Sequence, residues 1–188
     1  MHRLSAVGSL LVGAPLIGAL LVGAIRVERA ASAQHVAMPA GMTHEEHLAQ
    51  MDKEKAMKER GALAMGFDQD KTTHHFVLTA SGGFISVEVK DPADARSRDA
   101  IRIHLKAIAE EFASGDFGKP FQTHAEAPPG VQTLQRLKAA VAYRFEETER
   151  GGRVRISTKD ADALHAVHEF LSYQITEHTT GDPLTVQR

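Results

Sequence analysis

The stretch Phe76-Val-Leu-Thr-Ala-Ser-Gly-Gly-Phe-Ile-Ser-Val-Glu-Val-Lys90 decides the fold. Ile85, Val87 and Val89 alternate with polar residues, which is the pattern of a strand with one buried face. The glycine pair at 82–83 separates this strand from the apolar residues before it. Because glycine adopts positive φ without a Cβ clash, a Gly-Gly pair favours a tight turn. The stretch therefore predicts a β-hairpin.

The same pattern returns later in the chain. The stretch Val141-Ala-Tyr-Arg-Phe-Glu-Glu-Thr-Glu-Arg-Gly-Gly-Arg-Val-Arg-Ile-Ser157 again places a Gly-Gly turn between two strand-like segments. A helix that ends in Gly-Asp, at 115–116 or 181–182, follows each hairpin. The helices carry apolar stripes made of Ile101, Leu105, Ile108 and Phe112 in the first and Leu164, Leu171 and Ile175 in the second. We therefore predict an α+β fold in which two strand–strand–helix repeats form a four-stranded antiparallel sheet with two helices on one face.

The first 33 residues differ from the rest of the chain in composition. Residues 4–25 follow Arg3 and carry no charged side chain, and Ala31-Ser32-Ala33 matches the small-x-small pattern that signal peptidase cleaves. We therefore expect residues 1–33 to be a signal peptide and the protein to be periplasmic or secreted. The alternative is a membrane anchor over residues 4–25, because an uncharged run of this length can cross a bilayer.

A polar, Met/His-containing lead-in at residues 34–71 separates this segment from the repeats. Within it, Thr43 and Glu46 have the spacing of a capping box, which predicts that a helix begins there. The two repeats then form one domain over residues 72–182, and residues 183–188 form a tail.

Composition and charge exclude several classes of protein. The chain has no cysteine, so disulfides cannot stabilise it. Loss of residues 1–33 removes three Arg and one Glu and leaves a formal charge of about −4. This charge argues against nucleic acid as a partner, and against a membrane partner unless the apolar segment remains as an anchor. The sequence also lacks a complete catalytic motif, which favours a binding protein over an enzyme.

Histidine is the unusual residue of this chain. Ten of the eleven histidines follow residue 33, and imidazole is a ligand for copper, zinc and haem iron. Seven of them lie in or between the predicted repeats, and six of these seven are the candidate metal ligands: His74, His75, His104, His124, His168 and His178.

Periodicity places most of these imidazoles toward the core. His104 and His168 occupy similar places in the two predicted helices, and His178 lies on the same stripe as His168. His74 and His75 stand at the entry of the first strand, where alternation points one inward and the other outward. A buried imidazole needs partners for both ring nitrogens, so we expect at least two of His75, His104, His168 and His178 to meet. The alternative is that each is a core residue hydrogen-bonded to its surroundings.

The lead-in contains a second candidate metal site, formed by Met42, His44, His47 and Met51. His44, His47 and Met51 have the spacing that puts side chains on one helical face. A mixed thioether and imidazole set suits Cu(I). The alternative is a solvated helix in which this composition is incidental.

Five segments of the chain form a further set: Met65-Gly-Phe-Asp-Gln-Asp-Lys-Thr-Thr-His-His-Phe76, Asp91-Pro-Ala-Asp94, Pro128-Pro-Gly-Val131, Phe145–Ile156 and His168-Glu-Phe-Leu171. On the basis of these five segments, which span about residues 65–182, the chain resembles a family of short uncharacterised exported bacterial proteins. Members of that family sometimes carry the name aspartate carbamoyltransferase. This chain is too short for the two domains of that enzyme and lacks its Ser-Thr-Arg-Thr motif. The resemblance therefore implies the limits of the domain and no mechanism.

These observations favour a periplasmic, histidine-rich metal-binding protein, with copper ahead of zinc, that acts in metal storage, delivery or resistance. One alternative is a haem-binding module with His104 and His168 as axial ligands. Another is a small ligand-binding or interaction domain in which the histidines are incidental. The metal ion is the expected partner, and the sequence leaves the oligomeric state, including a homodimer, undecided.

Overall fold

The computed structural model describes residues 41–188. The predicted signal peptide or anchor at residues 1–33, and the first part of the lead-in, lie outside the described residues. In the described part, no helix has both the length and the apolar character needed to cross a membrane.

The described chain alternates pairs of strands with helices. The elements are, in order, α1 (His44–Met65), β1 (Thr72–Thr79), β2 (Gly82–Val89), α2 (Ala95–Ser114), α3 (Gly118–His124), α4 (Val131–Arg136), β3 (Val141–Thr148), β4 (Gly151–Thr158) and α5 (Ala161–Glu177). Single 3₁₀ turns at Gln69–Lys71 and Lys138–Ala140 lead into β1 and β3.

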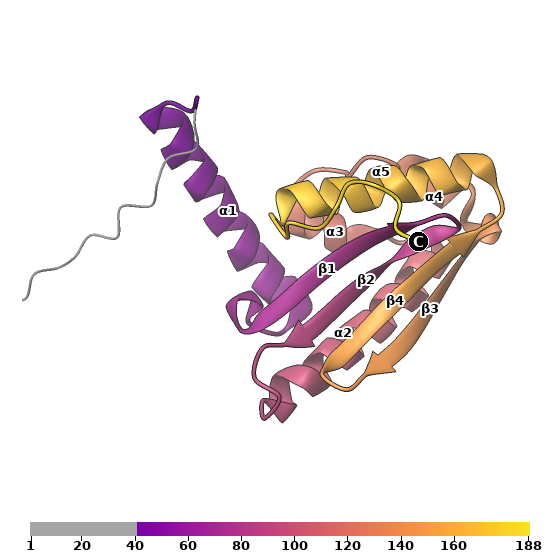
Figure 1. Ribbon diagram of the computed structural model, residues 1–188, viewed down its shortest axis with the longest axis horizontal. Helices are drawn as coiled ribbons and strands as arrows, with labels where there is room; N and C mark the ends of the chain where they lie inside the picture. The colour runs from indigo at the N-terminus through magenta and orange to yellow at the C-terminus, as the bar shows by residue number, and fades with distance from the viewer. Residues whose placement is uncertain (1–40) are drawn as a thin grey trace, which may run out of the picture. The chain divides into compact units, whose positions relative to one another are not determined.

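The four strands form one antiparallel sheet in the order β1-β2-β4-β3 (Figure 1). The predicted alternation holds in the central strands, where Ile85 and Val154 are buried while Ser86 and Arg155 lie on the other face. The buried face packs against the apolar stripes of α2 and α5, and together they make one core. The predicted α+β fold is confirmed.

The two helices that follow the hairpins, α2 and α5, each cover the hairpin of the other repeat. α2 packs mainly against β3 and β4, and α5 packs mainly against β1 and β2. The stripes that make these contacts contain fully buried side chains such as Ile101, Phe112 and Leu171. Removing such side chains from water supplies about 1.5–3 kcal/mol each, so the two repeats stabilise one another.

The two halves of the sheet are related by a local pseudo-twofold axis. Ile85 is the fourth residue of β2 and Val154 is the fourth residue of β4, and these two residues pair with each other. Asp94 and Asp160 cap α2 and α5 in the same way, each accepting a hydrogen bond from the backbone N–H three residues on. Corresponding positions of the two halves can therefore be compared directly.

The two long helices end differently, although the sequence predicts the same ending. α2 stops at Ser114 before the left-handed Gly115, as expected. α5 stops at Glu177, so that His178 becomes its cap and the Gly181-Asp182 pair lies beyond the helix. Beyond the helix end, the Asp182 carboxylate makes a tertiary contact, because it accepts the backbone N–H of Phe76 in β1 at 2.9 Å.

Candidate functional site

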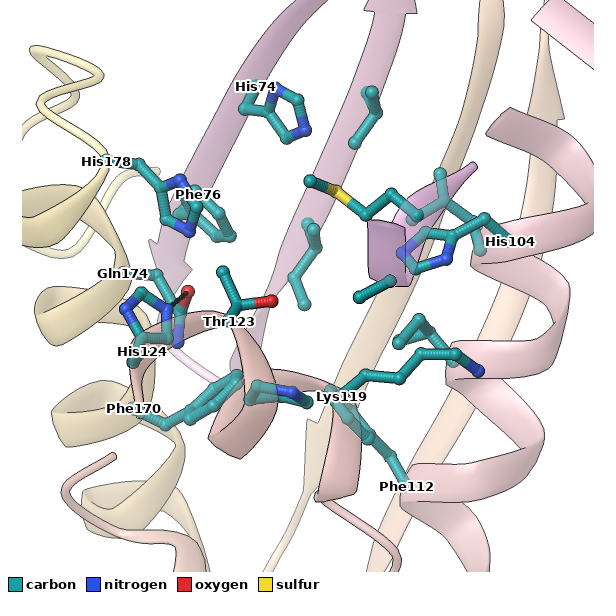
Figure 2. Close-up of a pocket in the computed structure, with 17 residues that line it drawn as sticks. His74, Phe76, His104, Phe112, Lys119, Thr123, His124, Phe170, Gln174 and His178 are labelled. Atoms are coloured by element: carbon teal, nitrogen blue, oxygen red, sulfur yellow. Dashed lines mark hydrogen bonds between the residues drawn. The ribbon is translucent and has the colours of Figure 1, made fainter. Parts of the chain in front are cut away.

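A cavity of about 70 Å³ lies between the sheet, α2, α3, α5 and the end of α1. Four imidazoles line it, from His74, His104, His124 and His178, and most of the other lining side chains are apolar (Figure 2). A buried water needs roughly 10–15 Å³ by this measure. The cavity therefore has room for an ion with a few waters or for a very small molecule.

His178 is the centre of a cluster of three imidazoles. Its ring lies 6.0 Å from that of His74 and parallel to it, and 5.1 Å from that of His124 and nearly perpendicular to it, measured between ring centroids. The ring of Phe76 stacks on His178 at 5.5 Å. Figure 2 shows His178 and His124 on one side of the cavity and His104 on the opposite side. The cluster therefore joins β1, α3 and the end of α5.

The structure resolves which of the two adjacent histidines in β1 faces inward. His74 points into the cavity, whereas the side chain of His75 is 51% exposed on the other face and contacts Asp182 at 2.9 Å. Of the four histidines among which at least two were expected to meet, His104 and His178 therefore line the cavity and His75 lies outside it. Strand alternation predicts opposite directions for neighbours but does not say which neighbour is inside.

His168 is also outside the cavity and has a structural contact of its own. Its Nε2–H points at two backbone carbonyl oxygens of the β1–β2 turn, 3.0 Å from that of Thr79 and 3.1 Å from that of Gly82. Both partners are acceptors, so Nε2 carries the proton. The expectation that His168 matches His104 is wrong, because each is a different number of residues from the start of its helix.

Burial keeps the cavity imidazoles neutral. Desolvation lowers the pKa of His74 and of His104 to about 4, and that of His178 to about 3. Burial also lowers the pKa of His124, although its hydrogen bond to Gln174 opposes the shift. At pH 7 each ring therefore has one N–H and one lone pair.

Several polar atoms in the cluster have no hydrogen-bond partner. His124 Nε2 lies 3.0 Å from Gln174 Oε1 and must donate to it, so the lone pair of a neutral ring is on Nδ1. His124 Nδ1, His74 Nε2 and Gln174 Nε2 are all buried without a partner. Unpaired buried polar groups are uncommon, and each leaves a donor or a lone pair free to bind a water, an ion or a ligand.

The charges around the cavity are few. No Asp or Glu is among the described residues that line it, and its single cationic side chain, Lys119, forms an ion pair with Glu111. A multiply charged cation would therefore enter without a neutralising carboxylate in the cavity wall.

At the positions that the pseudo-twofold axis relates to His74 and His178, the domain has aromatic residues. Tyr143 is the third residue of β3, as His74 is of β1, and Phe112 holds the place in α2 that His178 holds when counted from the start of α5. Phe112 and Tyr143 pack edge to face at 5.7 Å. The fold therefore accepts plain aromatic packing at these positions and does not itself require imidazoles.

The structure limits how a metal ion would be held. Within residues 41–188, no three His, Asp or Glu side chains are close enough together to hold one ion.

In the lead-in, α1 begins at His44 after the predicted capping box, in which Thr43 and Glu46 exchange hydrogen bonds of 2.8 and 3.2 Å. His44, His47 and Met51 lie along this helix with Met42 just before it, and Met51 is 48% exposed.

Sequence reasoning missed several residues of the cavity, namely Met65, Lys119, Thr123 and Gln174. α3, which carries Lys119, Thr123 and His124, is too short to show a helical period. Gln174 had a usable signal, since it is a polar residue on the apolar stripe beside Leu171 and Ile175.

Comparison with known proteins leaves the site to be interpreted from its own chemistry: no family model, no curated protein and no solved structure matches this chain.

Proposed function

We propose that this protein is an exported metal-binding protein and that two of the three imidazoles of His74, His124 and His178 bind one copper ion as Cu(I). The observation that carries the proposal is the meeting of three neutral imidazoles from separate elements, with buried ring nitrogens that lack a partner. Neutral imidazole is the form that binds metal, so protons do not compete for these rings at neutral pH.

Copper(I) is favoured over zinc by charge and by coordination. The free energy of moving an ion from water into an apolar cavity rises steeply with its charge, and no carboxylate lines this cavity to offset a second charge. Zn²⁺ takes about four ligands in proteins. Cu(I) is a softer ion that is stable with fewer donors, which suits a cluster that presents imidazoles in pairs.

Export and the second site belong to the same proposal. The apolar run and cleavage pattern of residues 1–33 support a periplasmic location. His44, His47 and Met51 on α1 supply a second, exposed Cu(I) site of lower affinity. A protein with one buried and one exposed site suits storage, delivery or resistance.

The haem alternative receives less support from the geometry. His104 lines the cavity while His168 contacts the β1–β2 turn, so the two proposed axial ligands do not share a space. The cavity of about 70 Å³ is also small beside the ~300–1,000 Å³ of pockets that hold larger ligands. A very small neutral molecule is the remaining alternative, favoured by the apolar lining and the unpaired amide of Gln174.

The test is an anaerobic titration of the full chain with Cu(I) in competition with a chromophoric Cu(I) chelator. The matched variant is His74→Tyr with His178→Phe, because Tyr143 and Phe112 occupy the positions that the pseudo-twofold axis relates to these two histidines. We expect the unmodified protein to bind Cu(I) far more tightly than micromolar, and the variant to lose at least about 100-fold in affinity.

A second variant separates the two proposed sites. His44→Ala with His47→Ala removes the imidazoles of α1 and is expected to leave the tight site intact. Binding no tighter than micromolar in the unmodified protein would refute the copper function. Tight binding that survives His74→Tyr with His178→Phe would refute its placement in the cavity.

A further inference from the structure

The segment that follows α5 presents His178 to the cavity through an unusual backbone path. Thr179 has a φ of 49° and Gly181 has a φ of 75°, and both values lie in the left-handed region. A non-glycine residue such as Thr179 adopts this conformation only where surrounding contacts hold it. These two residues turn the chain back so that Asp182 reaches the free edge of β1.

Asp182 is the contact that holds the segment in place. One oxygen of its carboxylate accepts the backbone N–H of Phe76 at 2.9 Å and the hydroxyl of Thr180 at 2.7 Å. The other oxygen lies 2.9 Å from Nδ1 of His75. Burial alone would raise the pKa of Asp182, but the hydrogen bonds from Phe76, His75 and Thr180 lower it below its usual value. The carboxylate is therefore ionised and accepts hydrogen bonds from three groups.

The strand residues that Asp182 holds are the neighbours of the cluster. Phe76 stacks on the His178 ring at 5.5 Å, and His75 directly follows the ligand His74 in β1. Asp182 thus joins β1, which carries His74, to the segment after α5, which carries His178. The corresponding residue in the other half, Asp116, instead accepts the backbone N–H of Gly118 at 2.8 Å. Of these two aspartates, Asp182 binds a strand, and that strand, β1, contributes His74 to the cavity.

We propose that Asp182 and His75 are positioning residues that hold His178 against His74 from outside the cavity and thereby set its metal affinity. This inference rests on the proposed copper function of the cluster. It also gives His75 a role beside the site rather than in it. Fixing a ligand in its binding geometry before the metal arrives increases affinity, because less order remains to be imposed.

The experiment compares Cu(I) affinity among variants of the full chain. We expect Asp182→Ala to lower the affinity by about tenfold or more, and His75→Ala to lower it by less. His75→Gln retains a donor for the carboxylate and is expected to restore most of the loss. Asp182→Asn preserves the side-chain volume and tests the charge alone should Asp182→Ala fail to fold.

A control variant distinguishes positioning from general stability. Asp160→Ala removes the cap at the far end of α5 and should destabilise the helix without changing Cu(I) affinity. Equal losses in Asp160→Ala and Asp182→Ala, or no loss in Asp182→Ala, would overturn the positioning role.

Ring signals of His178, recorded by NMR on the metal-free protein, supply a readout that does not depend on copper. We expect them to shift and broaden in Asp182→Ala and to stay unchanged in Asp160→Ala. If the unmodified protein binds no Cu(I), the copper function fails while these ring signals still decide whether Asp182 positions His178. Unchanged signals in Asp182→Ala would reject the positioning role itself.

Discussion

His168 and Arg102 make the same contact in the two halves of the domain. Each is the eighth residue of its helix, and each reaches the turn of the other repeat's hairpin, which its own helix covers. His168 donates to the carbonyls of Thr79 and Gly82, and Arg102 donates to those of Thr148 and Gly151. This equivalence assigns His168 to the fold and separates it from the histidines of the cavity.

We predict that His168→Leu lowers the free energy of unfolding by about 1–3 kcal/mol, because two partly buried carbonyls lose their donor. His168→Arg should retain most of the stability, since Arg102 shows that a guanidinium can fill this role. Denaturant unfolding measures both changes. Cu(I) affinity should be unchanged in each variant, and a lost affinity would show that His168 belongs to the site after all.

Acid should destabilise the metal-free protein in a defined range of pH. His74 and His104 have folded-state pKa values of about 4 and His178 of about 3, whereas an unfolded histidine has one near 6.5. Between these values the unfolded chain binds more protons than the folded one, so stability is complete above about pH 6.5 and falls as pH decreases toward 4.

The variant His104→Leu checks this assignment by removing one of the titrating groups. Its free energy of unfolding should depend less steeply on pH between about 6.5 and 4 than that of the unmodified protein. His165, which is 77% exposed, supplies the control, and His165→Gln should leave the slope unchanged. A slope that is the same in all three proteins would contradict burial as the cause.

Two glycines should respond in opposite ways to an added methyl group. Gly130 has a φ of 80°, and a Cβ there would lie 2.2 Å from the carbonyl oxygen of Ala166 in α5. We expect Gly130→Ala to destabilise the protein by at least about 2 kcal/mol, from strain and displacement of α5.

The comparison is Gly61→Ala, inside α1. Its Cβ would meet the ends of the Gln69 and Met65 side chains, which can rotate away with loss of the hydrogen bond from Gln69 to the Lys58 carbonyl. Alanine is about 1 kcal/mol better than glycine in a helix, which offsets this loss. The net change in unfolding free energy should stay within about 1 kcal/mol of zero. Denaturant midpoints measure both variants, and similar midpoints for the two would show that backbone contact at Gly130 is unimportant.

Bound copper should stabilise the folded chain by mass action. At a free Cu(I) concentration about 100 times the dissociation constant, the free energy of unfolding should rise by about 2.7 kcal/mol. The variant His74→Tyr with His178→Phe should show no such rise at the same concentration. Thermal unfolding under anaerobic conditions makes the measurement, and equal stabilisation of both proteins would locate the ion elsewhere.

The sequence by itself determined the elements of the sheet and the faces of the long helices. Alternation at Ile85, Val87 and Val154 is a local property, because a strand with one buried face must repeat every two residues. The glycine pairs at 82–83 and 151–152 correctly indicated the hairpins but not the turn residues: they begin β2 and β4, and residues 80–81 and 149–150 form the turns. The stripe through Ile101 and Leu105 is local in the same sense. These patterns were sufficient to predict the α+β fold and its two repeats.

Only the tertiary structure decided which histidines meet. His74 rather than His75 faces the core because pairing with β2 sets the direction of every side chain in β1, and a shift of one residue would reverse it. His178 lines the cavity because α5 ends at Glu177, and the chain beyond it turns back to β1, where Asp182 accepts the backbone N–H of Phe76. Both outcomes depend on residues distant in the chain, so no local period in the sequence contains them.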